Sequence, residues 1–514
     1  MKTYTPILAV AAAFVMAGCQ NYTAQSADFS SAWHTGRVQA AASEVQKKAS
    51  DNKDNKDTVI WNLELGTALR TEAMADLPPP ADPKAAPSTP MGAGSGTLPT
   101  IADPSNQYLK DSLTAFERAA DQIRKYDDQA KVHVGSEAGA LMVNLAQLPY
   151  TGRGCDRIML HVYAALDYMS LGNSDAARVE LHRVYQAQVD AKDANEKRIA
   201  ESQRLAAEAA KNGSKNQSGQ KAVFDASAAQ KNPAVNAALS DVDRETSGLI
   251  YQGYANYVNP YAVFLDGLFF MTNASGPSDT EHARKSFERL AGMTQNDFVK
   301  EDLATATDAA NGRNPENLTY VVFETGSAAS LQEWKLAVPV PVDQNKIVVA
   351  TVALPRLRVD NTFAPYLDVS AAGTTTRTEL LCNMDAVIAQ DFHNEWPSIL
   401  TKSLISTGLK AILNYQTQKQ TSNSGGGYAQ LFASLAMNIY SMASTIADTR
   451  SWTTLPKQFQ YCRIVTPPDR TITVSAPGCQ PHIVKLKAGK VNLVVIRNIA
   501  PGLPEFVDQA VLSI

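Results

Sequence analysis

The spacing of apolar residues changes at Pro315, and this change constrains the fold more than any other feature of the sequence. Before it, apolar residues recur every three to five positions, as in Trp61, Leu65 and Leu69, which is typical of amphipathic helices. After it, short β-branched and aromatic runs broken by Gly and Pro predict strands. These strands are expected at 318–323, 336–338, 347–352, 357–359, 459–466, 471–475, 482–486 and 491–497. The sequence therefore predicts an α+β multidomain fold, with helices over 19–310 and a mostly antiparallel domain over 315–514.

A helical hairpin is predicted inside the sheet domain, over residues 386–415 and 428–449, with Gly-rich residues 422–427 between its helices. The 20 residues from 428 to 447 carry no charge and are long enough to span a membrane. Their Ser, Thr, Asn and Gln side chains keep the stretch only moderately apolar, which favours a buried hairpin helix.

The helical half contains a repeat signal over residues 158–189. Tyr168 ends a first apolar stretch, Gly172 follows as a helix terminator, and Ala177 is a small residue in the next helix. This spacing resembles a tetratricopeptide repeat, in which Gly closes one helix and Ala lets the second approach closely. A looser copy runs over 259–290, and 108–123 would supply a further half-repeat. Stacked repeats of this kind predict a concave groove for a peptide or protein.

Two segments of the helical half are not expected to pack. The Pro- and Gly-rich stretch near 76–104 buries too little apolar area to order itself and is interpreted as a disordered loop. The polar stretch near 190–235 carries opposite charges four residues apart, which predicts a solvated helical extension that frays near Gly213 and Gly219. A coiled-coil arm is the alternative, although two sizeable apolar residues are few for a heptad seam.

Charge and cysteine content limit the classes of function. With 47 basic and 51 acidic residues the net charge is −4, so the composition does not favour a nucleic-acid partner. Besides Cys19, the chain has Cys155, Cys382, Cys462 and Cys479. Cys462 and Cys479 bracket a turn-rich stretch, and we predict a disulfide between them, with two buried free thiols as the alternative. The pairing of the other two is left open.

Familiar catalytic motifs are missing from the sequence, and no metal ligand set or cofactor is predicted. The best local cluster, residues 391–396, places Asp391 and Glu395 on either side of His393. Because Pro397 follows directly, we interpret it as a helix junction whose polar side chains face water. The sequence thus predicts a protein that is not an enzyme.

Residues 447–456 are interpreted as a structural joint between helix and sheet. Asp448 and Arg450 form an opposite-charge pair that is expected to bond backbone groups, Trp452 is an aromatic anchor, and Pro456 stops the helix before the next strand. A ligand contact is the alternative interpretation.

The N-terminus has the pattern of a bacterial lipoprotein signal. Lys2 precedes an apolar stretch too short to span a bilayer, and Ala17 and Gly18 stand directly before Cys19. This predicts removal of residues 1–18 and lipidation, including palmitate, at Cys19, with plain secretion as the alternative. Gln20 after the cysteine favours the outer membrane over the inner one.

Taken with the lipid signal, the motifs at 163–177, 259–269, 321–326 and 447–456 resemble a family of uncharacterised bacterial envelope lipoproteins. Members of that family join tetratricopeptide-like helices to a C-terminal α+β domain. The resemblance implies an envelope protein whose partners are other envelope proteins, and it carries over no catalytic residue.

The predicted function is therefore that of a non-enzymatic scaffold or activator in the cell envelope. It would be anchored to the outer membrane through Cys19 and would hold a protein or peptide partner in its helical groove. The alternative is an envelope hydrolase or glycan-binding protein with its site in the C-terminal domain. The oligomeric state is left open.

Overall fold

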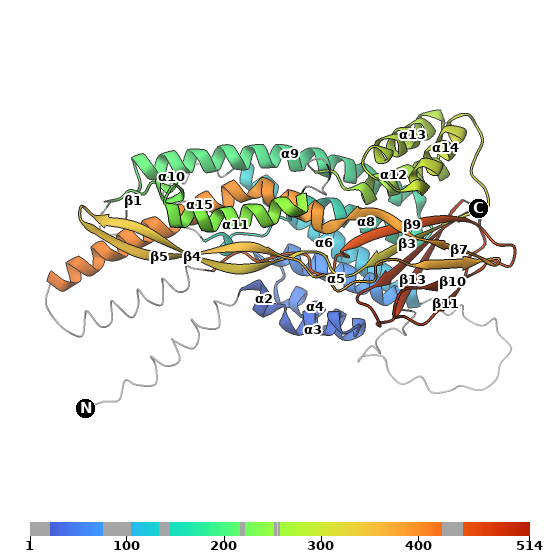
Figure 1. The fold of residues 1–514 in the computed structure, drawn as a ribbon, viewed down its shortest axis with the longest axis horizontal. Coiled ribbons are helices and arrows are strands. Elements are labelled where there is room, and N and C mark those ends of the chain that lie inside the picture. The colour runs from blue at the N-terminus through green and yellow to red at the C-terminus, as the bar shows by residue number, and fades with distance from the viewer. Residues whose placement is uncertain are drawn as a thin grey trace, which may run out of the picture.

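A computed structural model describes residues 21–75, 104–132, 144–215, 221–250, 254, 257–423 and 446–513. Helices come first and a mostly antiparallel sheet follows, so the α+β class is confirmed (Figure 1). Nearly all of the stretch predicted as a disordered loop lies outside the described residues, and Pro104 begins a helix.

The N-terminal helices surround one almost fully buried helix, α5. They are α2 (Tyr22–Gln25), α3 (Ala27–His34), α4 (Val38–Asp51), α5 (Thr58–Met74) and α6 (Pro104–Val132). Because α5 packs against α4, α6, α8 and strand β13, it has no face exposed to solvent, and even its charged side chains are buried. Gly66 lets α6 approach closely, since a Cβ at this position would lie 2.4 Å from the Phe116 ring.

Two helical hairpins follow. The first joins α8 (Gly154–Ser170) to α9 (Ser174–Lys211), after the short 3-10 helix η1 (Leu145–Gln147). The second joins α12 (Pro260–Thr272) to α13 (Pro277–Ala291), and α14 (Asp297–Ala310) packs against α13. The chain thus turns between helices at both places where the sequence suggested a repeat.

The central sheet has the strand order β13-β12-β3-β9-β8. Its strands are β3 (Leu318–Thr325), β8 (Glu379–Asn383), β9 (Gln458–Val465), β12 (Val491–Asn498) and β13 (Glu505–Ser513). β3 and β12 are parallel, whereas the other neighbours are antiparallel. A second sheet covers one face in the order β11-β10-β6-β7. It consists of β6 (Asp368–Ala371), β7 (Thr374–Arg377), β10 (Thr471–Ser475) and β11 (His482–Lys485).

Alternation along β3 shows how the layers share the central sheet. Tyr320 and Val322 belong to the core formed with the helices, whereas Val321 and Phe323 belong to the core between the two sheets. The helical core runs without interruption from α2 to β13. The described parts of the helical half and of the sheet half therefore share one apolar core, although the sequence predicts them as separate domains.

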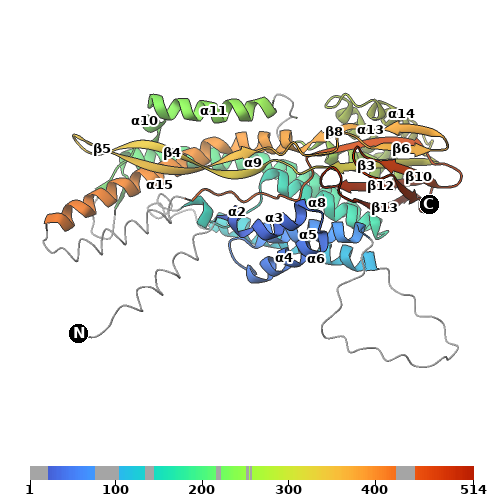
Figure 2. The same cartoon turned by 60° about the horizontal axis from the view of Figure 1, so that its bottom comes forward.

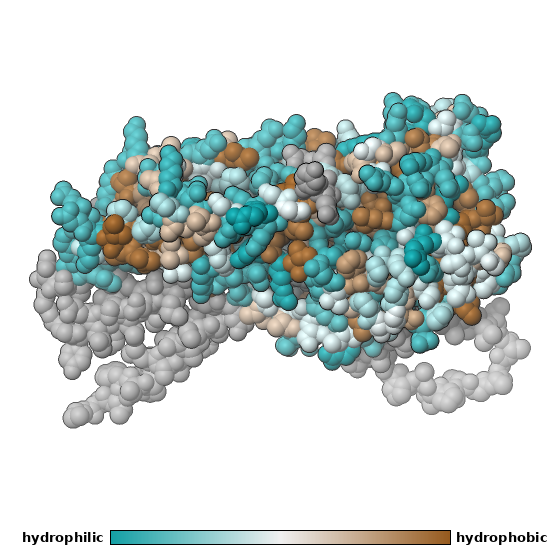
Figure 3. Space-filling model, viewed as in Figure 1, coloured by the Kyte–Doolittle hydropathy of each residue, from teal (hydrophilic) through white to brown (hydrophobic). Residues whose placement is uncertain are grey.

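A second core lies in an extension at one end of the molecule (Figure 1). Its elements are the distal part of α9, β1 (Ser214–Lys215), β2 (Lys221–Ala222), α10 (Ala226–Gln230), α11 (Pro233–Ile250), the ribbon of β4 (Ser330–Asp343) and β5 (Lys346–Arg358), and α15 (Met384–Asn423). Figure 3 shows an apolar cluster over the ribbon tip. There the side chains of Ile347 and Val349 are 65% and 72% exposed.

The polar stretch near 190–235 packs more extensively than its sequence predicts. The end of α9 lies against α15 and α10, and Ser202, Leu205 and Ala209 are buried. The extension was expected to fray near Gly213, and in the structure α9 stops at Lys211 and Gly213 has φ +64°. Gly219 lies outside the described residues. The solvated extension is thus one side of a packed module.

The predicted helical hairpin is described only in part. Its first helix is α15, which covers the predicted range 386–415 and continues through Pro397, so the helix junction expected at 391–396 is not present. Residues 428–445 of the second predicted helix lie outside the described residues, and 446–449 are not helical. Among the described residues, no helix is both long and apolar enough to cross a membrane.

Candidate functional site

The two helical hairpins enclose an open groove of about 500 Å³. One wall is α9, the floor is α12 and the other wall is α13. The lining residues are Leu181, His182, Val184, Tyr185, Gln188, Ala262, Val263, Asp266, His282, Lys285, Ser286 and Arg289. A cavity of this volume is in the range that holds a ligand or part of a peptide.

The turn between α8 and α9 sets the direction of the first wall. Gly172 has φ +73°, a conformation that suits glycine, and the Asn173 side chain accepts a hydrogen bond from the backbone N–H of Ala176 to cap α9. Ala177 is fully buried and Tyr168 is half-buried. These residues, predicted as packing residues of the repeat, shape the hairpin without lining the groove.

An arginine one turn before the groove residues of α9 links the two hairpins. Arg178 of α9 donates to the Asp279 carboxylate of α13 at 2.8 Å and to the Asn273 carbonyl at 2.6 Å. Its guanidinium also lies 4.8 Å from the centre of the Phe270 ring. These contacts of Arg178 hold α9 and α13 at a fixed separation.

The floor of the groove is apolar, and an aromatic side chain stands on its edge. Val184, Ala262 and Val263 are buried, whereas Tyr185 is 64% exposed. Tyrosine offers a large contact area with one polar end, which makes it frequent at binding surfaces. The groove can therefore hold an apolar side chain against its floor.

Charges on α13 are arranged in two neighbouring stripes. One stripe consists of Glu281, Arg284 and Glu288, and in it Arg284 donates hydrogen bonds to both carboxylates. The other stripe, one residue further round the helix, consists of His282, Lys285 and Arg289 and lines the groove. The groove wall is thus basic although the whole chain is acidic.

The acidic side chain in the groove is already bonded. Asp266 of α12 accepts hydrogen bonds from Nε2 of His282 at 2.7 Å and from Oγ of Ser286 at 2.8 Å. This bond to Asp266 raises the pKa of His282, although partial burial opposes the shift. Because His282 is paired with Asp266, Lys285 and Arg289 are the two other cations that line the groove.

The predicted joint at 447–456 connects the N-terminal helices to the sheet. Arg450 is 4% exposed and bonds the carboxylates of Asp57 and Asp448 at 2.9 and 2.7 Å. It also donates to the backbone carbonyls of Lys56, Leu145 and Leu148. Burial alone would raise the pKa of Asp448, but Arg450 outweighs it and lowers this pKa.

Two further residues complete this joint. The indole N–H of Trp452 donates to the hydroxyls of Thr67 and Thr454. Glu64 of α5, which the sequence did not single out, accepts from the backbone and hydroxyl groups of Thr453 and Thr454. Pro456 is buried just before β9. Arg450 and Trp452 thus bond residues of the N-terminal helices, whereas Asp448 bonds Arg450 within the joint.

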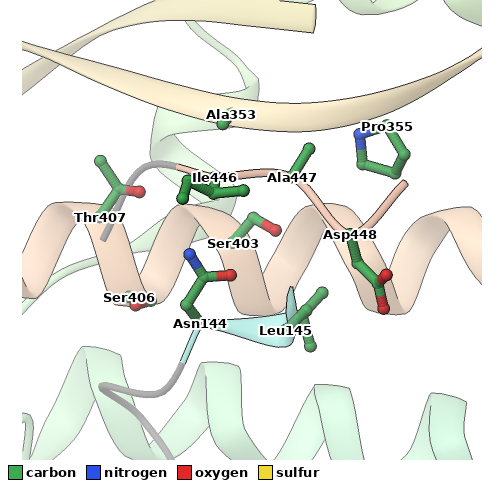
Figure 4. A pocket seen from close by; sticks show the side chains of 10 residues that line it. All are labelled: Asn144, Leu145, Ala353, Pro355, Ser403, Ser406, Thr407, Ile446, Ala447 and Asp448. Atoms are coloured by element: carbon green, nitrogen blue, oxygen red, sulfur yellow. The ribbon is translucent and has the colours of Figure 1, made fainter. Parts of the chain in front are cut away.

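A small hollow beside the joint has room for about one water molecule (Figure 4). Its volume is about 20 Å³, and Asp448, Ser403 and Asn144 are among its lining residues. In Figure 4, Ser403 belongs to α15, Ala353 and Pro355 belong to β5, and Asn144 lies at the start of η1 on the other side of α15. A space of this size does not hold a substrate.

The cluster at 391–396 is divided between two sides of α15. Asp391 accepts from the backbone N–H of Cys155 at the start of α8, and Glu395 bonds Arg153 and Arg198. Both carboxylates are buried, whereas His393 is exposed. The expectation that the acids face water is therefore wrong, because they bind α15 to α8 and α9.

The four described cysteines are free thiols, so the predicted disulfide between Cys462 and Cys479 is not formed in this structure. Cys462 is buried in the middle of β9, between the sheets. Cys479 lies in a turn, where its thiol contacts Asn498 and the Leu503 carbonyl. Burial raises the pKa of Cys462, which keeps it protonated and unreactive.

Comparisons with models of protein families, with characterised proteins and with solved structures find no match for this chain. Within the described ranges, no three His, Cys, Asp or Glu side chains are grouped so that they could hold a metal ion. The geometry of the groove is therefore the main indication of function. Its basic stripe was not predicted, although the spacing of His282, Lys285 and Arg289 on one helical face is visible in the sequence.

Proposed function

We propose that this protein is a lipid-anchored docking protein of the bacterial envelope that binds a segment of a partner protein between α9, α12 and α13. The observation that carries the proposal is the groove itself, which combines an apolar floor, an exposed Tyr185 and cations on one wall. Packed helical hairpins with concave surfaces are suited to holding extended or helical segments. The tetratricopeptide-like arrangement and the membership of the lipoprotein family are parts of this proposal.

The position of the lipid site supports an inward-facing groove. Asn21, the cap of α2, is two residues after Cys19, and two residues span at most about 7 Å. A lipid on Cys19 would therefore hold the α2 end close to the membrane surface. Figures 1 and 2 place α2 to α4 and α13 on opposite sides of the body. The groove would then face the periplasm, where a partner approaches.

The alternative function, a hydrolase or glycan-binding protein with its site in the sheet half, has less support. Asp302 accepts from Tyr320, Tyr461 and Arg463, and Asp385 pairs with Lys457. Carboxylates that already neutralise a buried cation serve the fold and are poorly placed for acid–base chemistry on a ligand.

Site-specific photocrosslinking in cells tests the docking function. A photoreactive phenylalanine replaces Tyr185 or Gln188 in the groove, and a matched variant carries it at Ile483, which is 68% exposed on β11. We expect both groove positions to give the same adduct, mapped by mass spectrometry to one segment of one protein. Adducts that form equally at Ile483, or none at either groove position, would exclude the groove as the docking site.

A second experiment tests the anchor. Radiolabelled palmitate should label the wild-type chain, and Cys19→Ala should abolish the label and release the protein from the membrane fraction. Label retained in the variant would refute lipidation at Cys19 without bearing on the groove.

A further inference from the structure

We propose that the segment bound in the groove is an acidic amphipathic helix, whose carboxylates lie along the His282, Lys285 and Arg289 stripe of α13. This inference rests on the proposed docking function and names the chemistry of the partner. It follows from the different character of the two sides of the groove. The floor and the α9 wall offer Val184, Tyr185 and the buried surface of α12, whereas the α13 wall offers positive charge.

The acidic side chains near this wall already have partners, and among them Asp266 bonds a member of the stripe, His282. Glu281 and Glu288, the acids nearest in sequence to Lys285 and Arg289, are held by Arg284, and Asp266 is held by His282 and Ser286. Lys285 keeps one long contact to Glu281, 3.9 Å, and its side chain is 68% exposed. Arg289 has no ion pair with any residue in the described part of the chain.

The spacing of the cations suits a helical partner. Lys285 and Arg289 are four residues apart on α13, which places their Cα atoms about 6 Å apart along the helix axis. Carboxylates four residues apart on a partner helix repeat at the same distance. Apolar residues on the neighbouring face of that helix would then contact the groove floor, as in other complexes of a helix with a groove. An acidic amphipathic helix satisfies both sides of the groove at once.

The test uses synthetic helical peptides of about 18 residues, or five turns, with one leucine stripe and a flanking position repeated every four residues. That position is Glu in the first peptide, Gln in the second and Lys in the third. Binding to the full mature protein in detergent is measured by fluorescence anisotropy. An oligonucleotide of equal negative charge serves as a competing polyanion.

The variants reverse charge in two places. Lys285→Glu with Arg289→Glu changes the groove. Lys47→Glu with Lys53→Glu makes the same change of net charge on two exposed lysines, one in α4 and one in the turn after it. We expect the wild type to bind the Glu peptide about fivefold more tightly than the Gln peptide, which corresponds to two exposed charge pairs. The groove variant should prefer the Lys peptide, and the control variant should behave like the wild type.

Several results would overturn the inference. Equal binding of the Glu and Gln peptides would show that the groove does not select charge, and would leave the docking function to the photocrosslinking result. If the Lys47 and Lys53 control variant lost the preference for the Glu peptide over the Gln peptide, that preference would come from the overall charge of the protein and not from the groove. Failure of all peptides to bind, or tighter binding of the oligonucleotide, would exclude an acidic helix as the ligand.

Discussion

Replacing Arg450 by Ala should destabilise the joint between the N-terminal helices and the sheet. The substitution removes one cation from two carboxylates, Asp57 and Asp448, and three donated bonds from backbone carbonyls. Removing one partner of a buried ion pair costs about 3–5 kcal/mol because the remaining charge has lost its compensation. Asp448 keeps some contact with solvent, its side chain being 20% exposed. We therefore expect the lower end, about 3 kcal/mol of unfolding free energy.

A lysine at this position should recover part of the loss. Arg450→Lys keeps the charge, but a single ammonium cannot contact both carboxylates and the three carbonyls that the guanidinium reaches. We expect this variant to lose about 1–2 kcal/mol. Its stability should fall between those of the wild type and the Ala variant.

The pH dependence gives a second measure of the same interaction. Arg450 lowers the pKa of Asp448 despite the burial of that carboxyl, so the folded state binds its proton less tightly than the unfolded chain does. The stabilisation is complete above the unfolded value of about 4 and is lost as the pH falls below it. In Arg450→Ala this loss below about pH 4 should shrink.

Urea unfolding followed by tryptophan fluorescence provides the assay, because Trp33, Trp61 and Trp452 are all buried in this part of the molecule. Arg313→Ala is the matched control, since Arg313 forms an exposed pair with Asp308 and its side chain is 71% exposed. The control should change stability by less than about 0.5 kcal/mol. An Arg450→Ala variant as stable as this control would refute the structural role of the joint.

Three further predictions concern other parts of the molecule. Gly408→Ala on α15 should lower the unfolding free energy by about 1–3 kcal/mol, because the added Cβ would lie 2.4 Å from the Phe224 ring. Gly248→Ala is the control, since nothing lies within 4 Å of its added Cβ. Equal urea midpoints for the two variants would contradict the packing around Gly408. Alkylation of the unfolded, non-reduced mature chain should label Cys155, Cys382, Cys462 and Cys479, and a protected pair would contradict the free thiols. The affinity for the Glu peptide should fall as the pH rises from about 6 to 8, because His282 loses its charge over this range. The pKa of His282 is raised by Asp266 and Asp279, and it is lowered by burial and by Lys285. His282→Gln should remove this pH dependence.

The path of α15 shows where a sequence rule was overridden. Pro397 predicts the end of a helix, since it cannot donate a backbone hydrogen bond and its ring crowds the preceding turn. In the structure Trp396, Leu400 and Leu404 are buried in the core of the extension, on both sides of the proline. Packing of this continuous face outweighs the local cost. No property of the residues around Pro397 alone reveals what they pack against.

The end of α9 shows why a polar pattern was misinterpreted. Its contact with α15 uses Ser202, Leu205 and Ala209, so two of the three buried positions are small residues that a search for large apolar side chains does not count. The strands β6 and β7 were missed because they offer few large apolar side chains: β6 is Asp-Val-Ser-Ala and β7 is Thr-Thr-Thr-Arg. The five-residue strand β8 was also missed, although β10 and β11 are as short and were predicted.

By itself the sequence determined that helices come first and strands follow after Pro315, and it located the turn at Gly172 and the loss of helix near Gly213. These depend on local periodicity and on backbone conformations that few residues adopt, and both can be read over a few positions. Only the tertiary structure decided that both halves share one core and that α13 presents its basic stripe to a groove. Such features depend on contacts between segments far apart in the chain, and their energies are absent from any local pattern.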